Sequence, residues 1–344
     1  MMHPPVRGAI AGAGYFAQFH AEAWRRIPEA EIVAVADPDL HRARHLAQRF
    51  GIPRAYSAVE EMLRAEKPDF LDIITRPDTH LPLAALAASH GVNVICQKPM
   101  APSLDECREM VQLAGRAGIR LLIHENWRWQ PWYREIRRLL DQGAFGRPFQ
   151  LFFLLRTGDG RGPEPYAVQP YFRSMPRLLV YETLVHFLDT FRFLLGEIDS
   201  VYCETARLNP VIAGEDAAWI HLHFRSGAAG LIDANRISGP VPPPPAFGDL
   251  RCEGEAAVLG MDGWGRLFVR PHGAQPEPHV YPVPETGYRG DSVFAFQRHA
   301  LGCLLSGEPC ESEGRSYLRT VHLVEACYES AASRRVVAME EYGD

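Results

Sequence analysis

A glycine-containing turn near the N-terminus constrains the fold of this chain more than any other stretch. A strand-like lead, apolar after Arg7, covers residues 7–11 and continues into Gly12-x-Gly14-x-x-Ala17, and residues 18–24 then have the character of a helix. In a strand–turn–helix unit, Gly12 permits a tight turn, Gly14 lets a pyrophosphate approach the main chain, and Ala17 lets the helix pack on its strand. The same spacing also occurs in ordinary strand–helix turns, so the surrounding sequence has to support a nucleotide site.

An acidic residue at the end of the next apolar run gives that support. Residues 31–36 form a second apolar strand, and Asp37 follows it at about the expected 20-residue offset from the turn. Its carboxylate can accept both ribose hydroxyls of NAD and would repel the 2′-phosphate of NADP. We therefore predict NAD as the cofactor, with NADP disfavoured. The alternative is that Asp37 only caps the helix that begins after Pro38.

Strands and helices alternate through the first 125 residues. Further apolar strands are expected at 69–74, 92–96 and 120–124, with helices at 39–50, 57–65, 77–90 and 103–117 between them. This alternation predicts a doubly wound parallel sheet of the Rossmann type, an α/β domain over residues 1–125. Ligands of such sheets bind outside the carboxyl ends of the strands. Residues 75–80, 97–99 and 125–128 follow strands directly and are the candidate site segments.

The remaining residues, 126–344, predict a second domain of α+β type. Strand-like runs between 146 and 270 favour a large, mostly antiparallel open sheet arranged as a meander, and two helices follow at 288–306 and 313–333. We expect those C-terminal helices to pack back on the first domain. One face of an open sheet packs on helices and the other stays free.

Composition excludes several classes of protein. The chain of 344 residues is 47% hydrophobic and 23% charged, with a formal net charge of −6, which argues against a general nucleic-acid surface. We expect no membrane span and no signal peptide. Seven cysteines are scattered without a Cys-x-x-Cys pair, which favours a reducing cytoplasm over disulfides or structural zinc. His221 and His223 alternate in one strand and lack a third ligand, so no metal site is predicted.

Two polar positions are candidates for acid–base chemistry. Lys98 directly follows a buried strand and precedes Pro99, and a lysine in a partly desolvated cleft can have its pKa lowered toward neutrality. The alternative is a surface lysine at a strand end. Glu182, His186 and Asp189 lie at i, i+4 and i+7 of a mostly apolar helix over 178–196. They form either a functional stripe or a satisfied core pair.

These residues together carry a resemblance to a known family. The pattern Gly12-x-Gly14-x-x-Ala17, Asp37, Thr75-x-Pro77-x-x-His80 and Gln97-Lys98-Pro99 resembles the Gfo/Idh/MocA oxidoreductases, which include glucose–fructose oxidoreductase and inositol 2-dehydrogenase. The resemblance extends to Asn126-x-Arg128 and to Glu182-x-x-x-His186-x-x-Asp189. Gln97 stands where the family usually has glutamate, and Glu182 where it usually has aspartate.

The resemblance implies an NAD(H)-dependent oxidoreductase acting on a hydroxyl/carbonyl pair of a sugar, cyclic polyol or related small molecule. It places His186 and Lys98 as candidates for acid–base work, with Glu182 orienting His186 or binding a neighbouring hydroxyl. It also implies a homodimer or homotetramer formed through the free face of the second sheet. The expected cofactor contacts are Gly12, Gly14, Tyr15, Phe16, Ala17, Asp37, Thr75, Pro77, His80, Gln97, Lys98, Asn126 and Arg128.

A non-catalytic protein that binds a dinucleotide as a sensor or scaffold is the alternative. The two departures from the family pattern motivate it. Gln97 and Glu182 both stand at positions where the family usually has a different, acidic side chain. Such a protein would bind the cofactor without turning over any polyol. The presence of Lys98, Glu182 and His186 together favours the enzyme.

Overall fold

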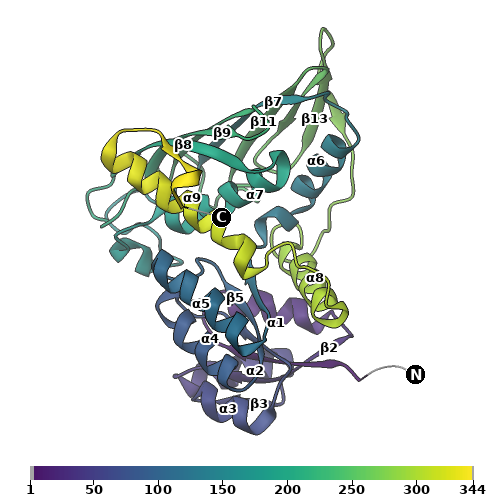
Figure 1. The fold of residues 1–344 in the computed structure, drawn as a ribbon, viewed down its shortest axis with the longest axis vertical. Coiled ribbons are helices and arrows are strands. Elements are labelled where there is room, and N and C mark those ends of the chain that lie inside the picture. The colour runs from purple at the N-terminus through teal and green to yellow at the C-terminus, as the bar shows by residue number, and fades with distance from the viewer. Residues whose placement is uncertain (1–3, 343–344) are drawn as a thin grey trace. The chain divides into compact units, whose positions relative to one another are not determined.

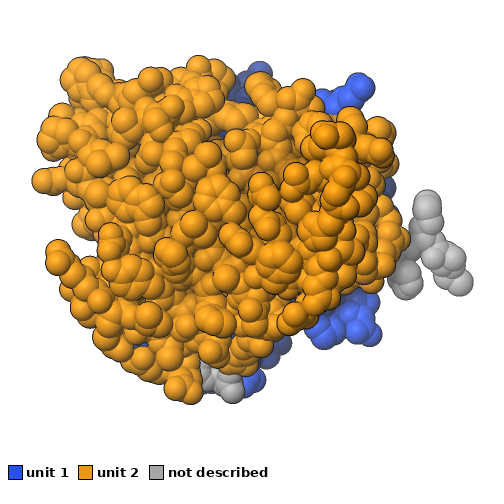
Figure 2. Space-filling view, turned by 90° about the horizontal axis from the view of Figure 1, so that it is seen from above, with its two compact units in different colours: residues 1–129, 285–321 blue, residues 130–284, 322–344 orange. Residues whose placement is uncertain are grey.

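The computed structural model describes residues 4–342, which divide into two compact units (Figures 1 and 2). The first unit contains the chain up to Trp129 together with 285–321. The second contains Gln130–Pro284 and the chain from His322 onward. Residues 285–321 therefore cluster with the N-terminal part of the chain. The boundary after residue 125 that the sequence suggests stays a prediction.

The first unit is built on a six-stranded sheet in the order β3-β2-β1-β4-β5-β6. All neighbouring strands are parallel, which confirms the doubly wound sheet expected from the sequence. The strands are β1 Val6–Ala11, β2 Ala30–Ala36, β3 Arg54–Tyr56, β4 Phe70–Ile73, β5 Asn93–Gln97 and β6 Leu121–His124.

Helices connect these strands and complete the first unit. They are α1 Ala17–Arg25, α2 Leu40–Phe50, α3 Val59–Glu66, α4 His80–Ser89, α5 Leu104–Ala117 and α8 Ser292–Ser306, with short 3₁₀ turns η1 Pro77–Thr79 and η2 Trp127–Trp129. A capping box begins α5, since Ser103 and Glu106 bond each other's backbone N–H groups. Trp24 of α1 and Phe296 of α8 share one buried cluster with Phe70, so α8 is part of this unit's core.

The second unit is built on a nine-stranded sheet in the order β14-β13-β12-β11-β7-β10-β9-β8-β15. Most pairs are antiparallel, as expected, and β7 and β10 are parallel. The strands are β7 Pro148–Arg156, β8 Ile198–Ala206, β9 Ala217–Phe224, β10 Ala229–Asn235, β11 Gly248–Gly254, β12 Ala257–Met261, β13 Leu267–Pro271, β14 Glu277–His279 and β15 Val337–Ala338.

Helices cover one face of this sheet (Figure 1). They are α6 Pro131–Asp141, η3 Pro170–Ser174, η4 Leu179–Leu184, α7 Val185–Leu195, α9 Gly314–Ser333 and η5 Met339–Tyr342; α9 spans the division between the units. Phe153 of β7 packs against Phe187 and Phe191 of α7, with ring centroids 4.2 and 5.9 Å away. Burying each such ring contributes about 2 kcal/mol. The other face stays open, because β9 alternates buried residues with exposed Trp219, His221 and His223.

The helix expected over 178–196 begins differently from the prediction. Residues 179–184 form a π-helical turn, η4, and regular α-helix starts only at Val185. The side chain of Glu215 explains how this wider turn is held, since its carboxylate accepts hydrogen bonds from the backbone of Leu178 and Val180. Tyr328 donates a 2.6 Å hydrogen bond to the same carboxylate. π-Turns are frequent at functional sites, and Glu182 lies in this one.

Three further details differ from the sequence-based expectation. The short strands β3 and β14 were not predicted, because three-residue edge strands carry too little alternation to be recognised. The second sheet is not a simple meander, since β7 lies between β11 and β10. Ser57 does not cap α3, whose N-cap is Ala58 without a side-chain bond. Within residues 4–342, no helix is long and apolar enough to cross a membrane.

Candidate active site

The turn between β1 and α1 is shaped for close approach to its backbone. Gly12 has φ of +101°, and a Cβ there would lie 2.7 Å from the carbonyl oxygen of Ile74, so a side chain is excluded. A Cβ at Gly14 would meet no described atom within 4 Å. The turn is therefore tight on the side facing β4 and open above Gly14, as a pyrophosphate site requires.

The N-terminus of α1 has no acidic side chain to occupy its N–H groups. The N-cap is Phe16, which makes no side-chain hydrogen bond, and the first turn contains no acid. Ala17 is fully buried, as its predicted packing role requires. Tyr15 is 50% exposed, and the ring of Phe16 packs edge-on to Tyr288 at 5.1 Å. The helix dipole at this end favours a bound anion.

Asp37 follows β2 and points its carboxylate at the same turn. One oxygen accepts a hydrogen bond of 2.8 Å from Ala13 N, and the other accepts one of 2.9 Å from Asp39 N. The residue that caps α2 is Asp39, which accepts from His41 N. The alternative reading of Asp37 as a plain helix cap is therefore wrong. The open space above Gly14, the uncapped helix and this carboxylate together fit the diphosphate and ribose of NAD.

The segment after β4 is held by hydrogen bonds within the first unit. Pro77 opens η1, and Thr79 donates a hydrogen bond of 2.6 Å to the hydroxyl of Thr75. His80 is fully buried, with Nδ1 3.1 Å from the carbonyl oxygen of Met100 and Nε2 3.2 Å from that of Thr75. Burial lowers the pKa of His80. A neutral ring can donate a hydrogen bond to only one of these two carbonyl oxygens at a time. Because His80 is buried between them, we interpret it as a residue that positions the segment after β4.

Gln97 lies at the centre of a buried polar network beneath Lys98. Its Oε1 accepts a 2.9 Å bond from Lys98 N, which orients the amide so that Nε2 donates. That nitrogen lies 3.0 Å from His20 Nε2 and 3.3 Å from His124 Nδ1. Both ring atoms must therefore be unprotonated acceptors. A glutamate at this position could not donate to either ring.

The network continues from His20 into the sheet. Its Nδ1 lies 2.8 Å from the carboxylate of Asp72, which also accepts a 2.7 Å bond from the indole of Trp24. His20 and Asp72 are both fully buried. With Nε2 accepting from Gln97, the ring keeps its proton on Nδ1 and donates it to Asp72. The network thus connects α1, β4, β5 and β6 at the carboxyl edge of the sheet.

Glu125 is a candidate site residue that the sequence analysis did not single out. It directly follows β6, is fully buried, and accepts hydrogen bonds from Trp127 N and the Tyr317 hydroxyl, each 3.1 Å long. Burial raises the pKa of its carboxyl to about 7, although its interactions with Trp127, Lys98 and Arg128 oppose the shift. The sequence feature that could have identified Glu125 is its place at a strand end, within the candidate segment 125–128.

Asn126 and Arg128 each have partners within the first unit. Asn126 donates a hydrogen bond of 2.7 Å to the hydroxyl of Ser292 at the start of α8. Arg128 is 8% exposed, and its guanidinium lies 3.4 Å from the carbonyl oxygen and 3.8 Å from the carboxylate of Glu311. These contacts fix both side chains, whereas their predicted contact with the cofactor stays a prediction.

In the second unit, η4 and α7 carry the predicted Glu182, His186 and Asp189. His186 and Asp189 are buried, and Glu182 is partly exposed. Glu182 accepts a 2.8 Å bond from the Thr183 hydroxyl and lies 3.7 Å from the guanidinium of Arg236. The structure thus gives Glu182 a cationic neighbour that the sequence did not indicate.

Arg236 is the second residue that sequence reasoning missed. It directly follows β10, is 5% exposed, and pairs with the carboxylate of Asp159 as well as Glu182. Burial alone would raise the pKa of Asp159, but the Arg236 charge and the hydrogen bonds from Arg236 and Thr157 together lower that pKa. The rings of Tyr166 and Phe172 lie 4.7 and 5.1 Å from the guanidinium carbon. The sequence feature that could have identified Arg236 is its place directly after an apolar strand.

Comparison with known proteins assigns a family to both the N-terminal and the C-terminal part of the chain. Residues 6–125 match the model of the oxidoreductase family with an NAD-binding Rossmann fold, and residues 133–263 match the GFO/IDH/MocA C-terminal domain. D-apiose dehydrogenase of Paraburkholderia graminis is 38% identical over 97% of this chain and 90% of its own length. D-apiose dehydrogenase of Rhizobium rhizogenes is 34% identical over 96% of this chain and 97% of its own.

A solved structure extends the likeness to three dimensions. An oxidoreductase from Agrobacterium radiobacter, in complex with NAD⁺, L-tartaric acid and magnesium, superposes with a TM-score of 0.90. It is 32% identical and covers 98% of this chain and 99% of its own. Together with the Rossmann turn, Asp37 and the Lys98–Pro99 pair, these matches confirm the resemblance seen in the sequence. The chain belongs to the Gfo/Idh/MocA family and is an NAD-dependent oxidoreductase.

Proposed function

We propose that this enzyme oxidises or reduces a hydroxyl/carbonyl pair of a small free sugar, with D-apiose as the first substrate to test. The two D-apiose dehydrogenases, similar over nearly their whole length, carry this proposal. The arrangement of Asp37 and the open turn above Gly14 supports NAD as the cofactor. The next substrate classes to test are cyclic polyols, such as inositols, and sugar acids.

The first unit supplies the groups that would hold NAD. The turn over Gly14 and the N-terminus of α1 receive the diphosphate, and Asp37 accepts the ribose hydroxyls. Its bond to Ala13 N holds that carboxylate in place without consuming all of its acceptor capacity. Bound NAD exchanges the hydride at its nicotinamide ring. The remaining predicted contacts line the ends of β4, β5 and β6.

Two side chains are proposed to handle the substrate oxygen. Lys98 would anchor and polarise it, because an ammonium group stabilises a developing alkoxide. His186 would take the hydroxyl proton during oxidation and return it during reduction, since its unperturbed pKa of about 6.5 suits work near neutrality. Glu182, held by Thr183 and Arg236, would orient His186 or bind a neighbouring hydroxyl.

Glu125 is proposed as a positioning residue for Lys98. The family usually has a carboxylate directly before this lysine, and here the neutral Gln97 takes that place. The Glu125 carboxylate interacts electrostatically with Lys98 and comes from the adjacent strand end. When ionised, it would supply the negative charge that Gln97 lacks, while Gln97 keeps the donor function that His20 and His124 need.

We also propose that the open face of the nine-stranded sheet forms a homo-oligomer interface. Its exposed residues include Trp219, 40% exposed on β9, with His221 and His223 on the same side of that strand. Large aromatic side chains on an otherwise regular sheet face are enriched at interfaces. The opposite face is covered by the unit's own helices, so only this face is free to take a second copy.

A reducing cytoplasm is the proposed location. All seven cysteines are free and buried. Free thiols persist where the environment is reducing.

The activity itself is tested by following absorbance of the nicotinamide while purified enzyme meets D-apiose, inositols and uronates. We expect turnover with one sugar class, and a fall in kcat of about 100-fold or more in Lys98→Met and in His186→Gln.

Lys67→Met is the matched control, because Lys67 is the only other lysine of the chain and is exposed. Full activity in either test variant, with normal NADH binding, would remove that residue from the mechanism. Cofactor binding without turnover on any substrate would favour the sensor instead.

Cofactor preference tests Asp37. Wild-type protein should bind NADH more tightly than NADPH, and Asp37→Ser should weaken NADH binding about tenfold or more, because a hydrogen bond to a charged group contributes about 1.5–3 kcal/mol. Fluorescence titration measures both affinities. The control is Asp39→Ser, which alters the cap of α2 two residues away. An unchanged NADH/NADPH ratio in Asp37→Ser would contradict the assignment.

The pH dependence of stability and rate tests Glu125. Its pKa of about 7 exceeds the ordinary 4.5, so between these values the folded protein keeps a proton that the unfolded chain releases. This group's contribution to stability therefore falls as pH rises through that window, by about 3 kcal/mol in total. Glu125→Gln should remove the fall, so its Tm should rise relative to wild type between pH 5 and 8.

The catalytic part of the Glu125 proposal has its own readout. If the ionised carboxylate supports Lys98, kcat/KM of wild type should rise with pH through about 7. That rise should disappear in Glu125→Gln and persist in Glu125→Asp, which retains a carboxylate. A variant that changes Tm but keeps the wild-type rate profile would limit Glu125 to a structural role.

Oligomeric state tests the sheet face. Light scattering after size exclusion should give a dimer or tetramer for wild type and a smaller species for Trp219→Glu, because the added charge would be buried without a partner. Trp264→Glu is the control, since Trp264 is 67% exposed in the turn between β12 and β13. A monomeric wild type, or an assembly that tolerates Trp219→Glu, would refute this interface.

A further inference from the structure

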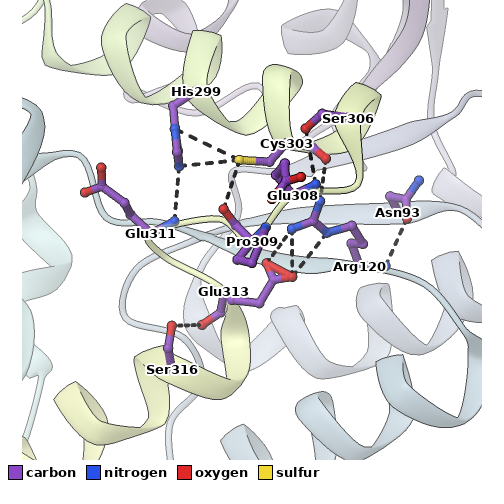
Figure 3. Close-up of polar contacts among 10 residues, drawn as sticks. All are labelled: Asn93, Arg120, His299, Cys303, Ser306, Glu308, Pro309, Glu311, Glu313 and Ser316. Carbon is purple, nitrogen blue, oxygen red and sulfur yellow. Dashed lines mark hydrogen bonds and ion pairs between the residues drawn. The ribbon is translucent and has the colours of Figure 1, made fainter.

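His299, Cys303 and Cys310 form a cluster of one histidine and two cysteines at the C-terminal end of α8. Figure 3 shows His299 and Cys303 with the segment that follows the helix. His299 and Cys303 are four residues apart on α8, so they share one face of the helix. The chain reverses after α8 ends at Gly307 and returns with Cys310. Their separation along the chain has none of the spacings that mark zinc sites in sequences, so only the fold reveals the cluster.

The geometry of the cluster matches the dimensions of a tetrahedral zinc site. The ligand atoms of His299, Cys303 and Cys310 all lie within 4.8 Å of one another. Cys303 Sγ lies 3.5 Å from His299 Nε2. With Zn–S of about 2.3 Å and Zn–N of about 2.0 Å, a tetrahedral centre separates sulfur and nitrogen ligands by about 3.5 Å and two sulfurs by about 3.8 Å. Binding would require only small side-chain movements.

We propose that His299, Cys303 and Cys310 form a zinc-binding site, with solvent as the fourth ligand. Imidazole and two thiolates are the donor types that zinc prefers in proteins. Binding converts two thiols to thiolates, and their two protons pass to solvent. Among residues 4–342, these three are the one group of histidine, cysteine and acidic side chains whose ligand atoms converge in this way.

The surroundings are suited to a metal site that can be entered from solvent. Both cysteines are 5% exposed, and His299 is partly exposed, which leaves one side open. The ring of Trp129 packs against that of His299 with centroids 4.6 Å apart and limits its rotation. His299 Nε2 accepts a 3.1 Å hydrogen bond from Glu311 N. This lone pair is available to a metal, and zinc would replace the hydrogen bond.

The segment that carries Cys310 is attached to the end of β6, which gives the site a consequence. Ile123 N donates a 2.8 Å bond to the carbonyl of Ser312, and Arg120 pairs with Glu313 at 2.8 Å. Glu311, beside Cys310, contacts Arg128. A zinc ion that joins α8 to this segment would therefore stabilise the loop that holds Arg128. We assign it this structural role and no step in catalysis.

Spectroscopy with cobalt tests the ligand set. Co²⁺ added to reduced, metal-free protein should give a thiolate-to-cobalt charge-transfer band that Zn²⁺ abolishes by displacement. The band should weaken in Cys303→Ala and Cys310→Ala, and zinc affinity should fall about tenfold or more in both of these variants and in His299→Gln. The matched control is Cys327→Ala, because Cys327 is also buried and hydrogen-bonds a second thiol, that of Cys203, without a histidine in the group.

A measurement on the wild-type protein keeps the proposal open to refutation if the variants fold poorly. Alkylation of thiols followed by peptide mass spectrometry should show slower modification of Cys303 and Cys310 when Zn²⁺ is present, with Cys327 unaffected. Zinc should also raise Tm, by an amount that grows with the logarithm of its concentration above Kd. Equal alkylation with and without zinc, or a cobalt complex that lacks the thiolate band, would overturn the site.

Discussion

The amide of Gln97 holds together the strand ends from which the first unit's candidate site is built. It accepts from Lys98 N and donates to His20 and His124, and through His20 it reaches the buried carboxylate of Asp72. A buried carboxylate without partners would be costly, and His20 and Trp24 of α1 supply the partners of Asp72. The position of Lys98 is a consequence of that network.

The same network explains why one departure from the family pattern leaves the site intact. A glutamate in place of Gln97 would present carboxylate oxygens instead of N–H donors to the ring nitrogens of His20 and His124. The glutamine supplies the donor for both rings and removes one negative charge from the neighbourhood of Lys98. Glu125 lies at the next strand end, and its pKa near 7 makes that charge available as a function of pH. Two neighbouring strands thus divide tasks that a single carboxylate would otherwise combine.

Features governed by local sequence were predictable, and features that depend on tertiary contacts were not. The parallel sheet, the capping box of α5 and the requirement for glycine at position 12 follow from periodicity and backbone sterics, and the structure confirms them. The pairing of Arg236 with Asp159 could not be predicted, because the two residues are 77 apart in sequence. The His299 cluster could not be predicted either, because only the reversal of the chain after α8 brings Cys310 to His299 and Cys303. The π-turn of η4 depends on Glu215, about 35 residues further along, and no helical pattern encodes it.

Both units use one strategy to keep charged groups ready for chemistry inside an apolar core. In the second unit, Arg236 is buried against Asp159 and Glu182 and is enclosed by aromatic rings, so its charge is compensated by two acids. Asp159 satisfies most of that charge, which leaves Glu182 at a longer 3.7 Å and bonded to Thr183. The π-turn that carries Glu182 is itself held by the side chain of Glu215, so the position of this carboxylate depends on a contact that is remote in sequence.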